Sequence, residues 1–258
     1  MALSATQVHE IEVVLKNSLR KKFQNYNPEP AKMPFHTRLL GKDRLALFSF
    51  IHSLNTNFGT SIFEPVAIVL AANNFHEAKS HQTAGEYISE EAHKVIQKII
   101  DDLSTARSSP NKVDEIEKIR QVCKKGEMKT VKPTKVDVFL ESHNGDLYLM
   151  DIKTAKPNAG GFKEFKRTLL EWVAVVLAVN PKAKVNTFVA IPYNPYEPKP
   201  YSRWTIRGML DLENELKVAE EFWDFLGGEG SYQQLLDCFE RVGIELRPEI
   251  DEYFHKFT

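Results

Sequence analysis

Apolar residues recur every three or four positions in several long segments of the chain, which is the period of an amphipathic α-helix. The first of these segments follows Ser4, a residue type that often caps a helix N-terminus. Its apolar positions are Val8, Ile11, Leu15, Leu19 and Phe23. Similar spacing predicts helices over residues 43–55, from residue 60 onward, over 89–103 and over 113–125. The pattern therefore predicts a largely helical N-terminal part.

The pattern changes in the middle of the chain. Residues 134–158 are typical of two strands joined by a turn, because apolar positions alternate on both sides of His143-Asn144-Gly145. A broad apolar face then predicts a long helix over residues 162–176, and residues 183–193 form a run typical of a buried strand. Residues 192–204 are too rich in proline for regular structure, and the remainder is again helical.

The order of these elements predicts the class of fold. Helices, a hairpin, a long helix, a strand and further helices favour an α/β core, with a central mixed β-sheet flanked by helices and an added helical layer. No convincing boundary divides the 258 residues, so we expect one domain over 1–258. Its helical N-terminal part covers about 1–125, its sheet core about 130–195 and its helical C-terminal part about 208–258.

Composition and charge narrow the class of protein. Hydrophobic residues make up 42% and charged residues 27%, as in ordinary globular proteins, and the net charge of −1 gives no global attraction to nucleic acid. Cys123 and Cys238 lie far apart without a Cys/His ligand spacing, which favours a reducing compartment and no structural zinc. The longest apolar run, residues 172–179, is too short for a bilayer, and no leader pattern precedes it. We expect a cytoplasmic protein without a membrane partner.

Three charged side chains interrupt the otherwise apolar hairpin, namely Asp137, Asp151 and Lys153. Charges directed at a core are costly, so the register of the hairpin decides their environment. A three-residue turn at 143–145, whose glycine adopts the left-handed conformation, sets Asp137 opposite Asp151. A two-residue Asn-Gly turn would instead set Asp137 opposite Ile152.

We favour the three-residue turn because it separates the charges from an apolar face. That face consists of Val136, Val138 and Leu140, and both carboxylates and Lys153 then share one face at one end of the hairpin. The alternative, which the spacing alone leaves open, is an exposed hairpin end with a solvated Lys–Asp pair.

Two facing carboxylates repel each other unless they are protonated or bridged by a cation. Mg²⁺ suits Asp137 and Asp151 because it takes oxygen ligands and keeps several waters, and the carbonyl of Ile152 offers another ligand. Lys153 would then lie beside the attacking water, where it could orient or help deprotonate that water, or stabilise charge on a phosphate. This arrangement fits metal-assisted hydrolysis of a phosphodiester.

The pattern D-x13-D-x-K, with the hairpin between its two halves, resembles the PD-(D/E)XK nuclease superfamily. Val136 stands where that superfamily often has proline, so the first half of the motif is relaxed. Four further blocks resemble one group of type II restriction endonucleases, which is associated with GGNCC-like sites. These blocks are "MPFHTRLLGKDRLALFSF", "DIKTAKPN", "AIPYNPYEPKPY" and "EEFWDFLGGEGSYQQLLDCFERVG", and the resemblance runs from about residue 33 to 243.

The resemblance implies a restriction-endonuclease-like core, a Mg²⁺ cofactor and cleavage of both strands of double-stranded DNA at a short palindromic GC-rich site. It implies 5′-phosphate ends and a homodimer, because a palindrome needs two active sites related by a twofold axis. A cognate DNA methyltransferase is expected in the same system, without direct contact. The alternatives are a repair or structure-selective nuclease of the same superfamily, and a DNA-binding module that does not catalyse.

Glu64 is a candidate fourth residue of the catalytic site. Many enzymes of this superfamily carry a helix glutamate near the metal, and Glu64 stands at a suitable place before an apolar run. Ser61 and Glu64 also show the spacing of a capping box, which explains the glutamate equally well. Because Pro65 is tolerated only in the first turn of a helix, Glu64 is expected near a helix start or a kink.

The chain after the hairpin is locally basic. Residues 153–184 contain seven Lys or Arg against two Asp or Glu, which suggests a surface that faces phosphates, although an ordinary solvated face explains it equally well. The stiff loop 192–204 could present polar and aromatic groups to DNA grooves or form a dimer contact. The DNA-contact candidates are Lys156, Asn158, Lys163, Lys166, Arg167, Tyr193, Asn194, Lys199 and Arg203.

Overall fold

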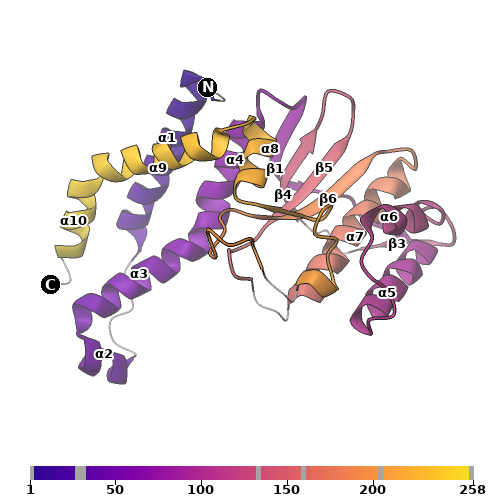
Figure 1. Ribbon diagram of the computed structural model, residues 1–258, viewed down its shortest axis with the longest axis horizontal. Coiled ribbons are helices and arrows are strands. Elements are labelled where there is room, and N and C mark those ends of the chain that lie inside the picture. Colours follow the sequence, from indigo (N-terminus) through magenta and orange to yellow (C-terminus); the bar gives the residue numbers. More distant parts are fainter. Residues whose placement is uncertain (1–2, 27–32, 132–134, 158–160, 203–205, 256–258) are drawn as a thin grey trace.

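A computed structural model of the chain describes residues 3–26, 33–131, 135–157, 161–202 and 206–255 (Figure 1). The helices are α1 (Ala5–Asn25), α2 (Pro34–Leu40), α3 (Lys42–Phe58), α4 (Glu64–Ala71), α5 (Glu90–Ser104), α6 (Lys112–Arg120), α7 (Phe162–Val179), α8 (Glu220–Gly227), α9 (Ser231–Glu245) and α10 (Arg247–His255). The strands are β1 (Glu77–Thr83), β2 (Tyr87–Ser89), β3 (Met128–Thr130), β4 (Lys135–Glu141), β5 (Leu147–Ile152), β6 (Val185–Ile191) and β7 (Leu216–Val218). None of the described helices is long and apolar enough to cross a membrane.

The central sheet has five strands in the order β1-β4-β5-β6-β7. Strands β1, β4 and β5 pair antiparallel, whereas β5, β6 and β7 pair parallel. A parallel pair needs a crossover connection, and α7 provides it between β5 and β6. The prediction of an α/β fold with a mixed sheet flanked by helices is therefore confirmed.

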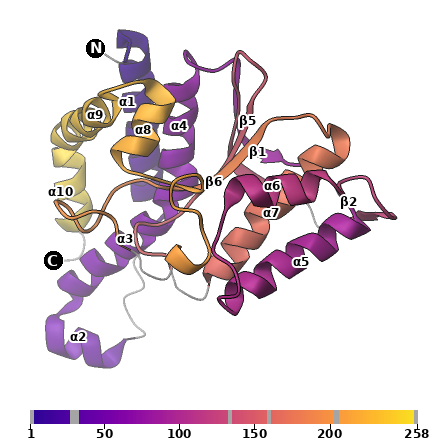
Figure 2. The ribbon, with the colours of Figure 1, turned by 45° about the vertical axis from the view of Figure 1, so that its right-hand side comes forward.

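Helices cover both faces of this sheet and enclose two separate cores (Figures 1 and 2). Because side chains alternate along a strand, Val138 and Leu140 of β4 enter the core beneath α1, α4, α8 and α9. Leu149 of β5 enters the other core, which is built largely with α5, α6 and α7. The ends of β4 and β5 thus lie between two packed layers that fix their position.

Two strands fall inside the N-terminal part that the pattern predicted to be helical. Strand β1 has the sequence EAKSHQT, lies at the edge of the sheet and exposes most of its side chains, so it lacks the apolar alternation that marks a strand. Strand β2 has three residues and pairs with β3 in a separate small sheet. The helical N-terminal part expected over about 1–125 therefore also contains two strands that the sequence pattern did not predict.

Helix α7 carries Lys166, which sequence analysis predicted to lie on a DNA-contacting surface. Lys166 is fully buried rather than solvated, and its ammonium group pairs with Glu115 of α6 and with Glu215, the latter at 2.6 Å. Lys112 completes the cluster by pairing with Glu215 at 2.9 Å. Burial alone would raise the pKa of Glu215, but its contacts with the two lysines outweigh burial and hold that pKa below its usual value. The prediction that Lys166 contacts DNA is wrong.

We expect Lys166→Ala to destabilise the fold strongly. The substitution removes one cation from a buried cluster of two lysines and two glutamates, and breaking such a network typically costs about 3–5 kcal/mol. Urea unfolding should show this loss in the free energy of unfolding. Lys163→Ala, at an exposed position of the same helix, is the matched control and should change it by less than about 0.5 kcal/mol. Equal effects of both substitutions would contradict the structural role of the cluster.

Candidate active site

The register of the β4–β5 hairpin follows the three-residue turn. Phe139 pairs with Leu149, and Gly145 has a φ of +80°, in the left-handed region that favours glycine. The amide of Ser142 donates to the carbonyl of Asp146 at 2.9 Å and closes the turn. Val138 pairs with Met150, so the next residues along the two strands, Asp137 and Asp151, lie opposite each other. This is the arrangement that the three-residue turn predicted.

The two aspartates and the lysine converge at one end of this hairpin. Asp137 accepts a hydrogen bond through Oδ2 from the backbone amide of Ile152 at 2.8 Å. The Nζ of Lys153 lies 2.7 Å from Oδ1 of Asp151. Asp151 is buried and Lys153 is partly exposed, so the hairpin presents a shielded carboxylate beside a cation that solvent can reach.

Glu64 joins this group from the other side of the sheet. A π-helical segment, Gly59–Phe63, links α3 to α4, and Glu64 is the first residue of α4. No side chain caps this helix start, so the capping-box interpretation of Ser61 and Glu64 does not hold. Pro65 lies in the first turn, as expected. Only 2% of Glu64 is exposed, and within the described part of the chain its buried Oε2 has no hydrogen-bond partner.

The three charged groups Glu64, Asp137 and Lys153 line one cleft of about 840 Å³. Its walls come from the end of α3, the π-helical segment, the chain after β5 and the loop after β6. Phe165 of α7 also lines the cleft, and its ring centroid lies 4.9 Å from Nζ of Lys153. A cation over an aromatic face is attracted to it, so Phe165 helps to position the lysine.

Burial and mutual repulsion raise the pKa values of all three carboxyl groups. Burial raises the pKa of Asp151 to about 7, and the nearby Asp137 adds to this rise while Lys153 opposes it. Burial, followed by the charge of Asp151, raises the pKa of Glu64 to about 7. Burial also raises the pKa of Asp137, against the hydrogen bond from Ile152. The site therefore concentrates more negative charge than the ion pair between Asp151 and Lys153 balances.

This site offers oxygen ligands of the kind that a hard divalent cation takes, with one buried carboxylate oxygen still unsatisfied. Over the residues described, no three His, Cys, Asp or Glu side chains are arranged as a complete metal-ligand set. Asp137 and Asp151 are the side chains best placed to hold such a cation, with Glu64 and the Ile152 carbonyl beside them. The donor set thus fits a divalent metal.

His81 is a residue of this site that sequence analysis missed. It lies on β1 between the pairs Ser80–Val138 and Gln82–Val136, which sets it opposite Asp137. Its Nε2 is 3.3 Å from Oε2 of Glu64, and its φ of +56° is uncommon for a residue other than glycine. No local signal marked it, because the edge strand that positions it was not predicted.

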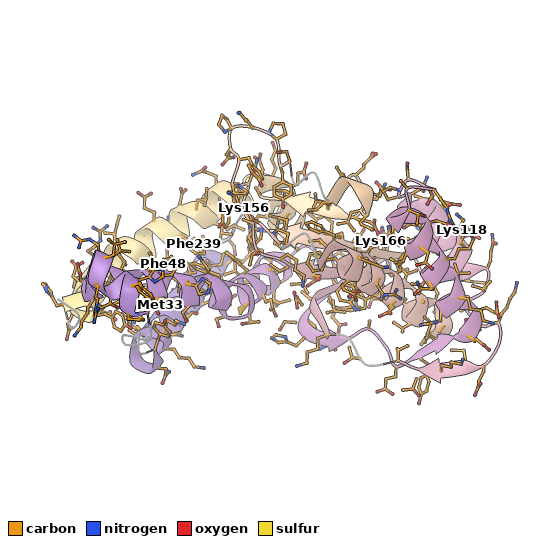
Figure 3. All side chains as sticks on the ribbon, turned by 90° about the horizontal axis from the view of Figure 1, so that it is seen from below. Met33, Phe48, Lys118, Lys156, Lys166 and Phe239 are labelled. Atoms are coloured by element: carbon orange, nitrogen blue, oxygen red, sulfur yellow. The ribbon has the colours of Figure 1, made fainter. Side chains whose placement is uncertain are left out.

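The structure separates the predicted DNA-contact residues into groups. Lys156 and Tyr193 line the catalytic cleft and are exposed, and the Nζ of Lys156 lies 5.3 Å from the ring centroid of Tyr196. Figure 3 shows Lys156 well apart from Lys166, which lies within the helical layer. Lys156 and Tyr193 therefore remain the DNA-contact predictions nearest to the catalytic group.

The other predicted contacts lie away from the cleft wall or have internal partners. Lys163 and Lys199 are exposed. Asn194 uses its amide within its own loop, accepting from the amide of Tyr196 at 3.0 Å and donating to the carbonyl of Lys199 at 2.7 Å. Arg167 donates to Gln97 of α5 at 2.8 Å. Asn158 and Arg203 lie outside the described residues.

The mixed five-stranded sheet, with an acidic cluster and a lysine at the end of its central hairpin, is a restriction-endonuclease-like α/β fold. Comparison with known families agrees, because the sequence model of the type II restriction endonuclease family HinfI matches residues 3–243. The chain belongs to this family, whose members are site-specific deoxyribonucleases.

Several characterised relatives are similar to the chain at low identity. The type II restriction enzyme MjaII of Methanocaldococcus jannaschii is 27% identical, over 98% of this chain and 74% of MjaII. HgiCII of Herpetosiphon aurantiacus is 26% identical, over 84% of this chain and 80% of HgiCII. HgiEI of the same organism is 25% identical, over 94% of this chain and 91% of HgiEI. All three are named type II restriction enzymes.

The acidic cluster predicts how stability depends on pH without metal. An aspartate in an unfolded chain has a pKa of about 3.9, whereas that of Asp151 in the fold is about 7, so its favourable contribution is complete below pH ~4 and is lost as pH rises through ~7. We expect the free energy of unfolding in EDTA to fall across this window, and Asp151→Asn to reduce the fall by on the order of 2 kcal/mol. Urea unfolding at a series of pH values measures both. An identical fall in the variant would refute the assignment.

Proposed function

We propose that this chain is a Mg²⁺-dependent endonuclease that hydrolyses both strands of a short palindromic GC-rich DNA site. The observation that supports this most directly is the convergence of Glu64, Asp137, Asp151 and Lys153 around one cleft of a restriction-endonuclease-like fold. Lys153 pairs with Asp151, and no lysine forms an ion pair with Asp137 or Glu64 among the described residues, so a divalent cation could neutralise these two carboxylates. The GC-rich, GGNCC-like target rests on the resemblance of the sequence blocks around this site.

In this proposal the chain's own groups bind the metal and position the reactants. Asp137 and Asp151 hold Mg²⁺, with Glu64 and the Ile152 carbonyl as further oxygen donors. When bound, Mg²⁺ offsets the negative charge that develops on the phosphate and makes water a better nucleophile. Lys153, positioned by Asp151 and Phe165, orients the attacking water or stabilises the charge on the phosphate oxygens.

The chemical outcome follows from in-line attack on phosphorus. The water oxygen forms a new bond to phosphorus as the bond from phosphorus to the 3′ oxygen breaks, and a proton is delivered to that oxygen. The products are a 5′-phosphate and a 3′-hydroxyl. For an enzyme with a restriction function we expect a cytoplasmic location. We also expect a cognate methyltransferase that protects the host's own sites.

Two other functions make different predictions about DNA. A repair or structure-selective nuclease would act on nicked or branched DNA rather than at one sequence in intact duplex. A DNA-binding module without catalysis would not need a buried, repulsive acidic cluster, which costs stability. The presence of Glu64, Asp137 and Lys153 in one cleft, with Asp151 paired to Lys153, therefore favours a catalyst.

Digestion of a plasmid of known sequence tests the proposed reaction. With Mg²⁺ the purified protein should yield discrete fragments whose ends carry 5′-phosphates, and EDTA should abolish cleavage. Asp151→Ala should lower the cleavage rate by at least about a thousandfold, because it removes a metal ligand. Sequencing of the fragment ends would identify the site.

Asp146→Ala is the matched control for this experiment. Asp146 lies on the same hairpin but next to the turn, at the end opposite the acidic cluster, so the variant should cut at the wild-type rate. Random nicking or cleavage limited to branched DNA would favour the repair nuclease instead. Retarded but intact plasmid under several divalent metals would favour the binding module.

We also propose a homodimer whose two copies meet through the arm formed by α2 and α3. This arm extends from the body of the molecule (Figure 1), and Figure 3 shows Met33 and Phe48 at this end. It carries a group of exposed apolar residues: Met33, Phe35, Leu39, Leu40, Leu47, Phe48 and Ile51. Exposed apolar groups gathered in this way are typical of interaction sites. A second copy is the partner that fits, because α3 ends in the wall of the cleft and a palindrome needs two clefts related by a twofold axis.

Phe48→Glu is expected to convert the dimer to monomers. Phe48 is 62% exposed, so the substitution should leave the fold intact while placing two like charges near each other across an interface around a twofold axis. Sedimentation equilibrium should show at least about a tenfold weaker dimer. Val113→Glu, at another exposed apolar residue on α6, is the control and should leave the mass unchanged. A wild-type monomer, or a Phe48→Glu dimer of unchanged affinity, would refute this interface.

A further inference from the structure

A second groove lies beside the catalytic cleft. It has a volume of about 740 Å³ and runs between α1, the end of α3 and the start of α4. Its lining includes the polar and basic residues Asn17, Ser18, Lys21, Lys22, Asn25 and Ser61. None of the described residues that line it is acidic. The groove is therefore a concave surface with two positive charges and no negative charge of its own.

Lys22 is the most unusual residue of this groove because it is a buried cation without an acidic partner. Only 8% of it is exposed. Its ammonium group contacts the hydroxyl of Ser53 and lies 4.3 Å from the ring centroid of Tyr26, and no carboxylate pairs with it in the described chain. Burial lowers the pKa of Lys22, which is the cost of shielding an unpaired charge. An anion bound in the groove would compensate this cost.

Two other basic residues of α1 are neutralised by ion pairs with glutamates. Lys16 pairs with Glu245 at 2.6 Å, and Arg20 pairs with Glu249 at 2.7 Å. These two residues are held by α9 and α10, so they serve packing between helices. Lys21 and Lys22 follow directly and have no such ion pair among the described residues. The basic residues of α1 that have no ion pair in the described structure thus both line the groove.

The groove and the catalytic cleft adjoin at Thr60. This exposed residue of the π-helical segment lines both, between Gly59 on the cleft side and Ser61 on the groove side. An extended polyanion that places one phosphate in the cleft can therefore continue across Thr60 into the groove. Amide and hydroxyl groups beside two lysines are suited to phosphate oxygens, which accept hydrogen bonds and attract cations.

We propose that the groove binds phosphate groups of the DNA backbone next to the cleaved position. Lys21 and Lys22 supply the charge, and Asn17, Ser18 and Ser61 supply hydrogen-bond donors. This inference rests on the proposed endonuclease function, because it assigns a second contact to the same substrate. The contacts are to the backbone, so they contribute to affinity for all duplex sequences rather than to the choice of one.

Binding of duplex DNA without cleavage tests this site. Fluorescence anisotropy in EDTA should give a roughly tenfold weaker affinity for the double variant Lys21→Gln, Lys22→Met, equally for a duplex with the cleavage site and for an unrelated duplex. The slope of log affinity against log salt should fall by about two, one for each lost phosphate contact. Lys16→Gln, on the same helix but outside the groove, should leave the slope unchanged.

Two further variants separate binding from folding. Asn17→Asp places a carboxylate at an exposed position of the groove and should weaken DNA binding without loss of stability. Lys22→Met alone should raise the melting temperature while lowering DNA affinity, because it removes an unpaired buried charge. Unchanged DNA affinity in the double variant and in Asn17→Asp would overturn this inference while wild-type cleavage persists. Failure of the wild type to bind or cut duplex DNA would instead overturn the proposed function.

Discussion

Repulsion among three carboxylates, two of them buried, is the constraint on which the candidate active site of this molecule depends. Asp137 and Asp151 face each other because the turn at Gly145 fixes the register of one hairpin, and Glu64 approaches from a helix on the other side. Each group raises the pKa of a neighbour, so the cluster opposes folding whenever it is ionised. The two cores on either side of the sheet must supply the stability that the cluster removes.

The buried cluster around Lys166 shows the opposite solution to the same physical problem. There, two lysines meet two glutamates, every charge has a partner within the fold, and nothing further is needed to balance it. At the candidate cleft Lys153 pairs with Asp151, whereas Oε2 of Glu64, which lies 3.3 Å from Nε2 of His81, makes no hydrogen bond within the described structure. A balanced buried cluster joins elements of the fold, whereas an unbalanced one creates affinity for something that the chain itself does not contain.

Sequence analysis predicted those parts of the structure that depend only on residues close together in the chain. The hairpin register depends on a single turn and on the alternation of Val138 and Leu140, so the sequence could favour the pairing of Asp137 with Asp151, although a two-residue turn remained an alternative. The overall class of fold followed in the same way from the order of helices and strands.

Long-range partners could not be predicted in this way. Lys166 has the same local pattern as a solvated lysine, and its burial is possible because it pairs with Glu115 and Glu215, both distant in sequence. His81 reaches the site because β1 adds to the edge of the sheet, and that pairing leaves no periodic signal in a polar strand. The choice between a cap and a site residue for Glu64 likewise depended on the packing of α4 rather than on its spacing from Ser61.

A single helical column connects the features that a restriction enzyme must coordinate. Helix α3 begins in the exposed apolar arm, lines the cleft with Asn55 and Phe58, and continues through the π-helical segment to Glu64. The insertion of a π-turn rotates the helix that follows, so Gly59–Phe63 determines which side chains enter the cleft and which enter the basic groove. A partner copy that binds the arm, and a DNA backbone that crosses Thr60, would therefore both act on the element that carries Glu64. One continuous run of helix thus joins the exposed arm, the cleft and the groove to the position of Glu64.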